Sequence, residues 1–390
     1  MFSLPLAPSK GGGQGEAKSS KTPTNCPITT ICYSQKIPNP ENFSESLPPK
    51  INMTLEQRID ALAALGRHLL GEDEYLRAVM HRTHFNNPWF TMENQERAIR
   101  AIATHFLDRE KLEAWAAGYA IAEPPPMKTI GLVMAGNLPL VGFHDVVCTF
   151  TAGHKAKIKL SDKDKFLLPY LLDLLKRHNP AAGDFFEITD RLKGYDAVIA
   201  TGSNNSARYF EAYFGKYPHI IRKNRNAVAV LNGSETSDDL HELGKDVFRY
   251  FGLGCRNVSK LYVPQGYDFR PLLEKLHEFK DIALHDKYMN NFDYNMALVM
   301  LNRVPFLNNS CIILTEDHNI ASRVAMLHYA FYTDKISLVE ELTARREEIQ
   351  CVVGREAVTG FPVLPFGKTQ EPGLGDYPDG VDVMALITGV

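Results

Sequence analysis

The spacing of hydrophobic residues along the chain changes character near residue 125. After Thr54 and Gln57, which have the positions of a helix-capping box, apolar side chains recur at every third or fourth residue: Leu55, Ile59, Leu62, Leu65 and Leu69. That period is typical of an amphipathic helix, and similar patterns continue to about residue 121. Three prolines at 124–126 then end the pattern, because proline cannot continue a helix. We predict a mostly helical region over 53–124.

Beyond the prolines, short apolar runs alternate with helical patterns, which is typical of a mostly parallel sheet with helices on both faces. We expect a first set of strands at 129–134, 156–160, 197–200 and 228–231, and a second set at 258–263, 311–314 and 349–353. The predicted fold is therefore α/β, with two α/β domains at 125–232 and 233–363. The C-terminal segment, 364–390, is expected to form a final strand at 381–388 and to return to the core or to an oligomer interface.

The first 52 residues have a different composition. They contain Gly11-Gly12-Gly13 and many Ser, Thr and Pro residues without a helical or strand period. Such a composition buries too little surface to offset the entropy of ordering. The stretch also lacks the basic start and continuous apolar core of a secretory signal. We predict a disordered extension over 1–52, and we expect the functional protein to begin near Met53.

Charge and cysteine content narrow the class of protein. The formal net charge of −3 is too small to create a basic surface for nucleic acid. No apolar run approaches the ~18–20 residues that span a bilayer. The six cysteines include no CxxC pair, and no histidine cluster has zinc-ligand spacing, so we expect no metal site and no disulfide framework. These features favour a cytoplasmic protein.

Cys255 has the strongest case for chemistry among the cysteines. It follows Gly252 and Gly254, which end a predicted helix and let another molecule approach the main chain closely. A thiol on such a turn can face an open cleft beside a backbone N–H. A lone cysteine is more often a passive small hydrophobe, so this turn alone does not establish catalysis.

Three polar turns follow predicted strands of the first domain, at the edge where open α/β sheets bind ligands. Asn137 carries an amide that can polarise a carbonyl, although asparagine is also common in plain turns. Lys159 and Ser161 end the next strand, where they suit either a ribose and phosphate or simply solvent. Thr201-Gly202-Ser203 precedes a helix, so its N–H groups can face a phosphate, or Ser203 can serve only as a helix cap.

The order of these elements resembles the aldehyde dehydrogenase superfamily over about residues 128–376. The Asn-x-Pro, Lys-Pro-Ser, Thr-Gly-Ser and Gly-x-x-Cys elements of that family correspond to Asn137-Leu138-Pro139, Lys159-Leu160-Ser161, Thr201-Gly202-Ser203 and Gly252-Leu253-Gly254-Cys255. Its later Pro-Phe-Gly and Ser-Gly-x-Gly correspond to Pro365-Phe366-Gly367 and Pro372-Gly373-Leu374-Gly375. The resemblance implies that Cys255 is a nucleophile and Asn137 an oxyanion donor. It also implies that a nicotinamide cofactor contacts Lys159, Ser161, Thr201, Gly202 and Ser203.

One departure from the superfamily pattern points to a different fate of the acyl group. Hydrolytic members have Glu-Leu-Gly-Gly-Lys, whose glutamate activates water. The matching stretch here is Arg222-Lys223-Asn224-Arg225-Asn226, which has no carboxylate and whose basic side chains suit phosphates. Together with the chain length, Gly254-Cys255 and Phe366-Gly367-Lys368-Thr369-Gln370, this departure resembles the LuxC-type acyl-CoA reductases.

The resemblance implies reduction of an acyl-CoA to an aldehyde and coenzyme A through a thioester on Cys255. NADPH is the expected reductant because Lys159 and Lys163 suit a 2′-phosphate, with NADH as the other option. No histidine near Cys255 is evident, so a helix or oxyanion-hole environment would have to lower the pKa of the thiol. The implied partners are the acyl-CoA substrate, a second copy of the chain and an acyl-transferring or ligase protein.

Three alternatives remain open at the level of sequence. The nearest is a hydrolytic or phosphorylating aldehyde dehydrogenase of the same fold. A second is a non-redox acyltransferase that uses Cys255 only to carry acyl groups. The third is a non-enzymatic scaffold, which has no reason to keep Asn137, Cys255 and Thr201-Gly202-Ser203 together.

Overall fold

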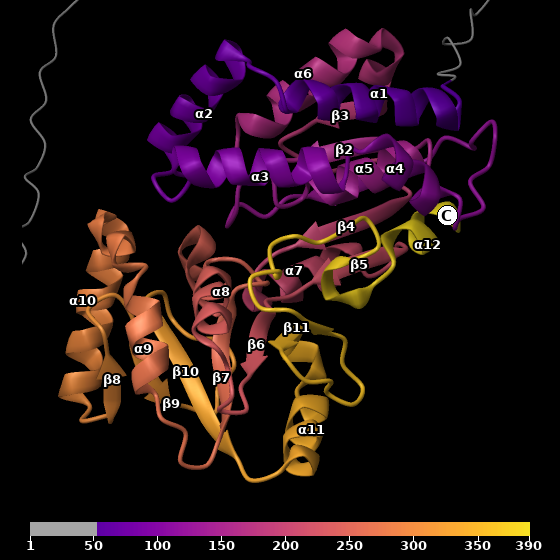
Figure 1. The fold of residues 1–390 in the computed structure, drawn as a ribbon. Coiled ribbons are helices and arrows are strands. Elements are labelled where there is room, and N and C mark those ends of the chain that lie inside the picture. Colours follow the sequence, from indigo (N-terminus) through magenta and orange to yellow (C-terminus); the bar gives the residue numbers. More distant parts are fainter. Residues whose placement is uncertain (1–52) are drawn as a thin grey trace, which may run out of the picture. The chain divides into compact units, whose positions relative to one another are not determined.

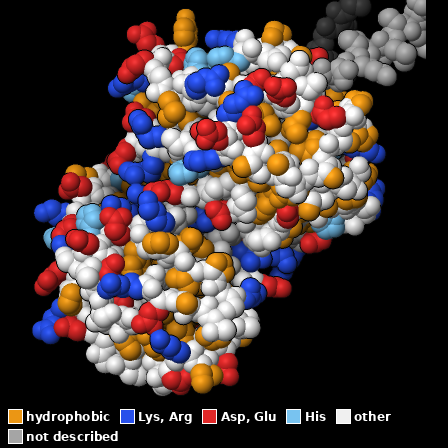
Figure 2. Space-filling view, turned by 45° about the vertical axis from the view of Figure 1, so that its right-hand side comes forward, with side chains coloured by type: hydrophobic (Ala, Val, Ile, Leu, Met, Phe, Trp, Pro, Cys, Tyr) orange, Lys and Arg blue, Asp and Glu red, His pale blue; other side chains and the backbone are white. Residues whose placement is uncertain are grey.

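The structure is a computed structural model that describes residues 53–390 (Figure 1). The extension predicted over 1–52, with Cys26 and Cys32, lies outside the described residues. Lys and Arg side chains are interspersed with Asp and Glu on the face shown in Figure 2. Within residues 53–390 no helix combines the length and apolarity needed to cross a membrane, and no group of three or more His, Cys, Asp or Glu side chains could hold a metal ion.

Four helices form the predicted helical region: α1 (Leu55–Leu69), α2 (Glu74–Asn86), α3 (Met92–His105) and α4 (Arg109–Ala116). The capping box is present at the start of α1, where the Thr54 side chain accepts a hydrogen bond from the Gln57 backbone and the Gln57 side chain accepts one from Thr54. The apolar stripe of α1 packs on helices of the first sheet, α5 (Phe143–Thr151) and α6 (Leu167–His178). The helical region therefore shares one hydrophobic core with the first domain.

The first sheet is parallel throughout, with strand order β3-β2-β1-β4-β5. Its strands are β1 (Thr129–Val133), β2 (Lys155–Lys159), β3 (Phe186–Ile188), β4 (Ala197–Thr201) and β5 (His219–Arg222), and α7 (Asn204–Phe214) joins the last two. The chain runs outward from β1 to β2 and β3 and then crosses to β4 on the other side. The loops that leave β1 and β4 thus turn in opposite directions, which is where open α/β sheets form their ligand crevice.

The second sheet has seven strands in the order β12-β11-β6-β7-β10-β9-β8, antiparallel only between β8 and β9. Its strands are β6 (Asn226–Val230), β7 (Val258–Pro264), β8 (Phe306–Asn308), β9 (Ile313–Glu316), β10 (Met326–Tyr332), β11 (Ile349–Gly354) and β12 (Val363–Leu364). Its helices are α8 (Ser237–Phe248), α9 (Arg270–His277), α10 (Asp286–Leu301) and α11 (Lys335–Ala344). The α/β fold predicted from the sequence is confirmed.

Two details of the prediction are wrong. The expected boundary at 232 placed the strand near Val228 in the first domain, but β6 pairs with β7 and β11 in the second sheet. The sequence of a buried apolar strand does not indicate which of the two sheets the strand joins. The segment expected as a final strand at 381–388 is the helix α12 (Val383–Thr388). Asp382 caps this helix by accepting a hydrogen bond from the Ala385 N–H at 2.9 Å, and α12 packs on α5 in the first core.

Candidate active site

The polar turns predicted as ligand contacts gather at the carboxyl edge of the first sheet. The turn containing Asn137 follows β1, Lys159 and Ser161 end β2 and follow it, and Thr201-Gly202-Ser203 ends β4. Because β1 lies between β2 and β4, all three turns adjoin the crevice where the strand order reverses. The structure therefore brings these residues to one edge, as the sequence predicts.

Close packing at this edge requires a glycine at position 136. A side-chain carbon added to Gly136 would lie 2.2 Å from Ser161 Oγ and 2.9 Å from Lys163 Cβ. The β1 turn therefore rests directly on the segment after β2. Its backbone is held within reach of Ser161, so both turns can contact one ligand.

Lys159 differs from the other lysines of its strand. Lys155 and Lys157 both pair with Glu187 of β3, at 2.8 and 3.1 Å. Lys159 is exposed at the end of β2 and makes no ion pair within residues 53–390. The ammonium group of Lys159 can therefore bind an anion at the sheet edge, whereas those of Lys155 and Lys157 are paired with Glu187.

The turn after β4 combines a helix cap with a close backbone approach. Ser203 caps α7, since its Oγ accepts a hydrogen bond from the Ser206 N–H at 3.2 Å. Gly202 is tightly packed, because an added side-chain carbon would lie 2.8 Å from the ring of Phe210. The amino end of α7, with its partial positive charge, thus points to the same edge as Asn137 and Lys159.

Cys255 lies in a strained turn between α8 and β7. Tyr250, Phe251 and Gly252 have φ values of 54°, 60° and 73°, and non-glycine residues in this left-handed region cost about 1–2 kcal/mol each. The Phe251 ring packs against both Trp89 and His285, with ring centroids 5.2 and 4.4 Å away, and those two rings stack on each other at 5.1 Å. Strain of this kind persists only where surrounding packing imposes it, and it is concentrated at functional sites.

Asn137 connects the first sheet to this turn. Its side-chain Nδ2 donates a hydrogen bond to the Leu253 carbonyl at 2.9 Å, across 116 residues of sequence. An amide nitrogen has two donors, so one N–H fixes the turn and the other remains for a ligand. The structure thus brings together the two residues for which the sequence predicts catalytic roles.

Cys255 opens into a mostly apolar cavity of about 140 Å³. Helix α3 contributes Ala98, Ala101 and Ile102, and the segment after β1 contributes Leu138 and Val141. Polar residues at the cavity include Arg256 and Gln370. A cavity with this lining suits a hydrocarbon chain whose reacting end lies at the sulfur.

Electrostatics around the thiol oppose its ionisation in the free protein. Burial raises the pKa of Cys255, and the Asp379 carboxylate adds to the rise, against the guanidiniums of Arg256 and Arg222. The expectation that the surroundings lower this pKa is therefore wrong, because burial and the Asp379 carboxylate together outweigh the two guanidiniums.

The remaining described cysteines have a weaker case for nucleophilic chemistry. Burial raises the pKa of Cys311 and of Cys351 to about 12 and that of Cys148 well above its ordinary value. None of the three lies in the cavity at Cys255. Among residues 53–390, Cys255 is therefore the one cysteine with both a cavity and a neighbouring amide donor.

Not all of the basic side chains in the stretch 222–226 are available to an anionic ligand. Arg222 is buried and makes two hydrogen bonds to the Asp145 carboxylate, at 2.7 and 2.8 Å. Arg225 lies 3.5 Å from the Asp379 carboxylate. Arg222 is therefore unavailable to a phosphate, contrary to the expectation for this stretch.

Sequence reasoning missed Asp379, Tyr250 and Arg256. Asp379 comes from the C-terminal segment and faces Arg222, Arg225 and Cys255. Arg256 donates a hydrogen bond to the Asp376 carbonyl, and Tyr250 lines the cavity. Arg256 directly follows Cys255, a signal that was available in the sequence, and Tyr250 lies five residues before it. Nothing in the sequence connects Asp379 to the thiol.

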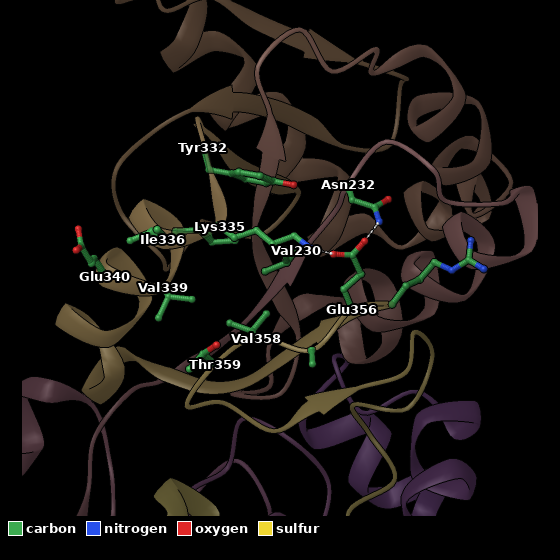
Figure 3. A pocket seen from close by; sticks show the side chains of 13 residues that line it. Val230, Asn232, Tyr332, Lys335, Ile336, Val339, Glu340, Glu356, Val358 and Thr359 are labelled. Carbon is green, nitrogen blue, oxygen red and sulfur yellow. Dashed lines mark hydrogen bonds and ion pairs between the residues drawn. The ribbon is translucent and has the colours of Figure 1, made fainter.

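A second apolar cavity, of about 340 Å³, lies at the carboxyl ends of β6, β10 and β11 (Figure 3). Glu356 there accepts hydrogen bonds from Asn232, at 2.7 Å, and pairs with Lys335. The Tyr332 hydroxyl donates to the Leu231 carbonyl. Cys255 precedes the amino end of β7, at the opposite edge of the same sheet, so this cavity is separate from the nucleophile.

Comparison with solved structures identifies the fold. An NADP-dependent enzyme of E. coli aligns with a TM-score of 0.59 and 13% identity, over 78% of this chain and 74% of that one. The aldehyde dehydrogenase KauB from Pseudomonas aeruginosa gives 0.56 and 13%, over 77% and 72%. An indole-3-acetaldehyde dehydrogenase in complex with NAD+ gives 0.56 and 14%, over 77% and 72%. No protein-family model and no curated protein matches the sequence. The described chain has the aldehyde dehydrogenase fold.

Proposed function

We propose that this protein is an oxidoreductase that reduces an acyl-CoA to an aldehyde and free coenzyme A, with NADPH as the reductant. The observation that carries the proposal is the contact between Asn137 and the Cys255 turn. It joins the turn that carries an amide donor to the turn of a thiol that lines an apolar cavity. The absence of a glutamate in the 222–226 stretch favours release of the acyl group by reduction over hydrolysis.

The first step is acyl transfer to sulfur. The Cys255 thiolate attacks the thioester carbonyl, a new carbon–sulfur bond forms, and the bond to coenzyme A breaks. The proton lost by Cys255 balances the one that the departing thiolate gains. The free N–H of Asn137 stabilises the oxyanion of the intermediate, a contribution worth about 2.7–4 kcal/mol for one such donor.

The residues at the first sheet edge fit a nicotinamide dinucleotide. Lys159, which has no ion-pair partner within residues 53–390, would meet a phosphate or ribose, and Ser161 and the turn 201–203 would meet the remaining polar groups. A reduced nicotinamide bound there would supply the hydride that the thioester carbon needs. Asn137 then stabilises the second oxyanion, and Cys255 is released as the thiohemiacetal breaks down to the aldehyde.

Intact-mass measurement after addition of acyl-CoA without reductant tests the acyl-cysteine step. We expect an adduct on the wild-type chain and on Cys351→Ala, a matched control that removes the other partly exposed cysteine of the described chain. Cys255→Ala should give none. An adduct of equal yield on Cys255→Ala would refute the proposed nucleophile.

Asp379 favours one alternative, a hydrolytic aldehyde dehydrogenase. Its carboxylate faces Cys255, although it comes from a different element than the usual glutamate. Product analysis of the wild type and of Asp379→Asn separates the two. Our proposal predicts aldehyde from both, and an acylation profile shifted to lower pH in the variant because a carboxylate that raises the thiol pKa is gone. Free acid from the wild type, lost in Asp379→Asn, would establish the hydrolytic alternative.

A further inference from the structure

The cavity of Figure 3 lies where the strand order of the second sheet reverses. After β6 the chain continues to β7 on one side, and after β11 it continues to β12 on the other, while β6 and β11 are neighbours. The segments that follow both strands line the cavity, with Asn232 after β6 and residues 355–359 after β11. A crevice outside the carboxyl ends of parallel strands, at such a reversal, is where open α/β sheets bind ligands.

The walls of this cavity are mostly aliphatic. Helix α11 contributes Ile336, Leu338 and Val339, and the segments at the ends of β6 and β11 contribute Val230 and Val358. The volume of about 340 Å³ lies within the range of roughly 300–1,000 Å³ that small-molecule sites occupy. An apolar cavity of about 150 Å³ takes up benzene, so this one has room for an aliphatic chain of about ten carbons.

One carboxylate ties together three segments of the cavity wall. Glu356, after β11, accepts a hydrogen bond from Asn232 Nδ2 at 2.7 Å and pairs with Lys335 Nζ at the start of α11 at 2.5 Å. The dashed lines in Figure 3 mark both contacts. Because they join the ends of β6 and β11 to α11, the shape of the cavity is set before a ligand binds, which lowers the entropic cost of binding.

The charged side chains of the lining are paired or point away from the cavity. Lys335 is paired with Glu356, and Arg355 Nη1 lies 3.2 Å from the Asp239 carboxylate. Figure 3 shows the Glu340 carboxylate turned away from the other labelled side chains. A charged ligand would therefore lose hydration without gaining an unpaired opposite charge, so the lining favours an uncharged molecule.

We propose that this cavity binds an aliphatic molecule with an uncharged polar end, such as an alcohol or an aldehyde. The aliphatic walls take up the chain, and the exposed hydroxyl of Thr359 exchanges a hydrogen bond with the polar end. The site is separate from Cys255, and the inference does not depend on the proposed function.

Photoaffinity labelling of the wild-type chain tests the site directly. The probe is an aliphatic alcohol with a diazirine on its chain, and labelled positions are located in tryptic peptides. We expect saturable labelling of the peptides 336–345 and 356–368. 1-Octanol should compete at least about tenfold better than octanoate or octylammonium, because the charged ends lose hydration at the cavity. Absence of saturable labelling in both peptides, or equal competition by a charged analogue, would overturn the proposal.

Two variants separate this cavity from the one at Cys255. Val339→Phe fills part of the cavity of Figure 3 and should lower labelling of peptide 356–368 about tenfold, because the chain no longer fits. Ala101→Phe is the matched control, since it fills part of the cavity at Cys255 and should leave that labelling as in the wild type. Ile336→Glu, at a position that is 74% exposed, places a charge at the cavity without disturbing the core and should act like Val339→Phe. Unchanged labelling of peptide 356–368 in Val339→Phe or in Ile336→Glu would overturn the assignment, as would its loss in Ala101→Phe.

Discussion

At the scale of single residues, Asp164 holds the turn that carries Asn137. Its Oδ2 accepts a hydrogen bond from the Leu140 N–H at 2.8 Å, and Leu140 has a left-handed φ of 57°. Burial raises the Asp164 pKa from 3.8 to about 6. The group is buried, so a rise of this size corresponds to about 3 kcal/mol at most.

The raised pKa of Asp164 determines whether the stability of the protein rises or falls with pH. The folded state holds the Asp164 proton more tightly than the unfolded state, so the contribution of this group is fully present below pH 3.8 and is lost as pH rises through about 6. Asp164→Asn keeps an oxygen for the Leu140 N–H without the charge. We expect the variant to be more stable than the wild type at pH 7 and to lose that advantage at pH 4, as measured by denaturant unfolding. Equal stability of the two proteins at pH 7 would contradict this account.

The placement of residues was predictable where a motif carried it. Cys255 and Asn137 follow glycine-marked turns, and the structure joins those turns by a hydrogen bond. Asp379 and Arg97 were not predictable as neighbours of the nucleophile turn, because packing between distant segments brings them there. The buried pair of Arg222 and Asp145 shows the same limit, since a basic run in sequence does not reveal which of its members is neutralised inside the fold.

At the scale of elements, the spacing of hydrophobic residues predicted where helices and parallel strands lie along the chain. It did not predict which strands pair with one another. Thr54 and Gln57 marked the start of α1 correctly. The apolar run at 383–388 was misassigned as a strand because it is short, and Asp382 as a helix cap was the signal that distinguishes the two. The placement of β6 depends on pairing in three dimensions, which no local pattern records.

The turn between β1 and α5 gives a prediction at this scale. Gly136→Ala would place a carbon 2.2 Å from Ser161 Oγ, so the turn must move away from the β2 end. We expect NADPH affinity to fall about tenfold or more, measured by fluorescence titration, with the fold retained. Gly375→Ala is the matched control, because nothing lies within 4 Å of an added carbon there. The same loss in both variants would show that the effect is not local to the turn.

At the scale of the whole described chain, the proposed reaction draws on both sheets. The first offers a carboxyl edge with an unpaired lysine and a helix amino end, and the second offers the strained turn of Cys255 before β7. Asn137 is the residue that links them. The aldehyde dehydrogenase fold was predictable because the order of the motifs follows the order of the elements. The lining of the cavity at Cys255 was not, since its walls come from α3, the segment after β1 and the C-terminal segment.

The central claim is that an acyl group held on Cys255 is removed by reduction. The most direct measurement isolates the acylated chain, free of acyl-CoA, and adds NADPH in a single turnover. The account predicts one equivalent of aldehyde per acyl group, with the mass of the chain returning to that of the free thiol. Release of the acyl group as free acid, or an adduct that persists with NADPH present, would contradict it.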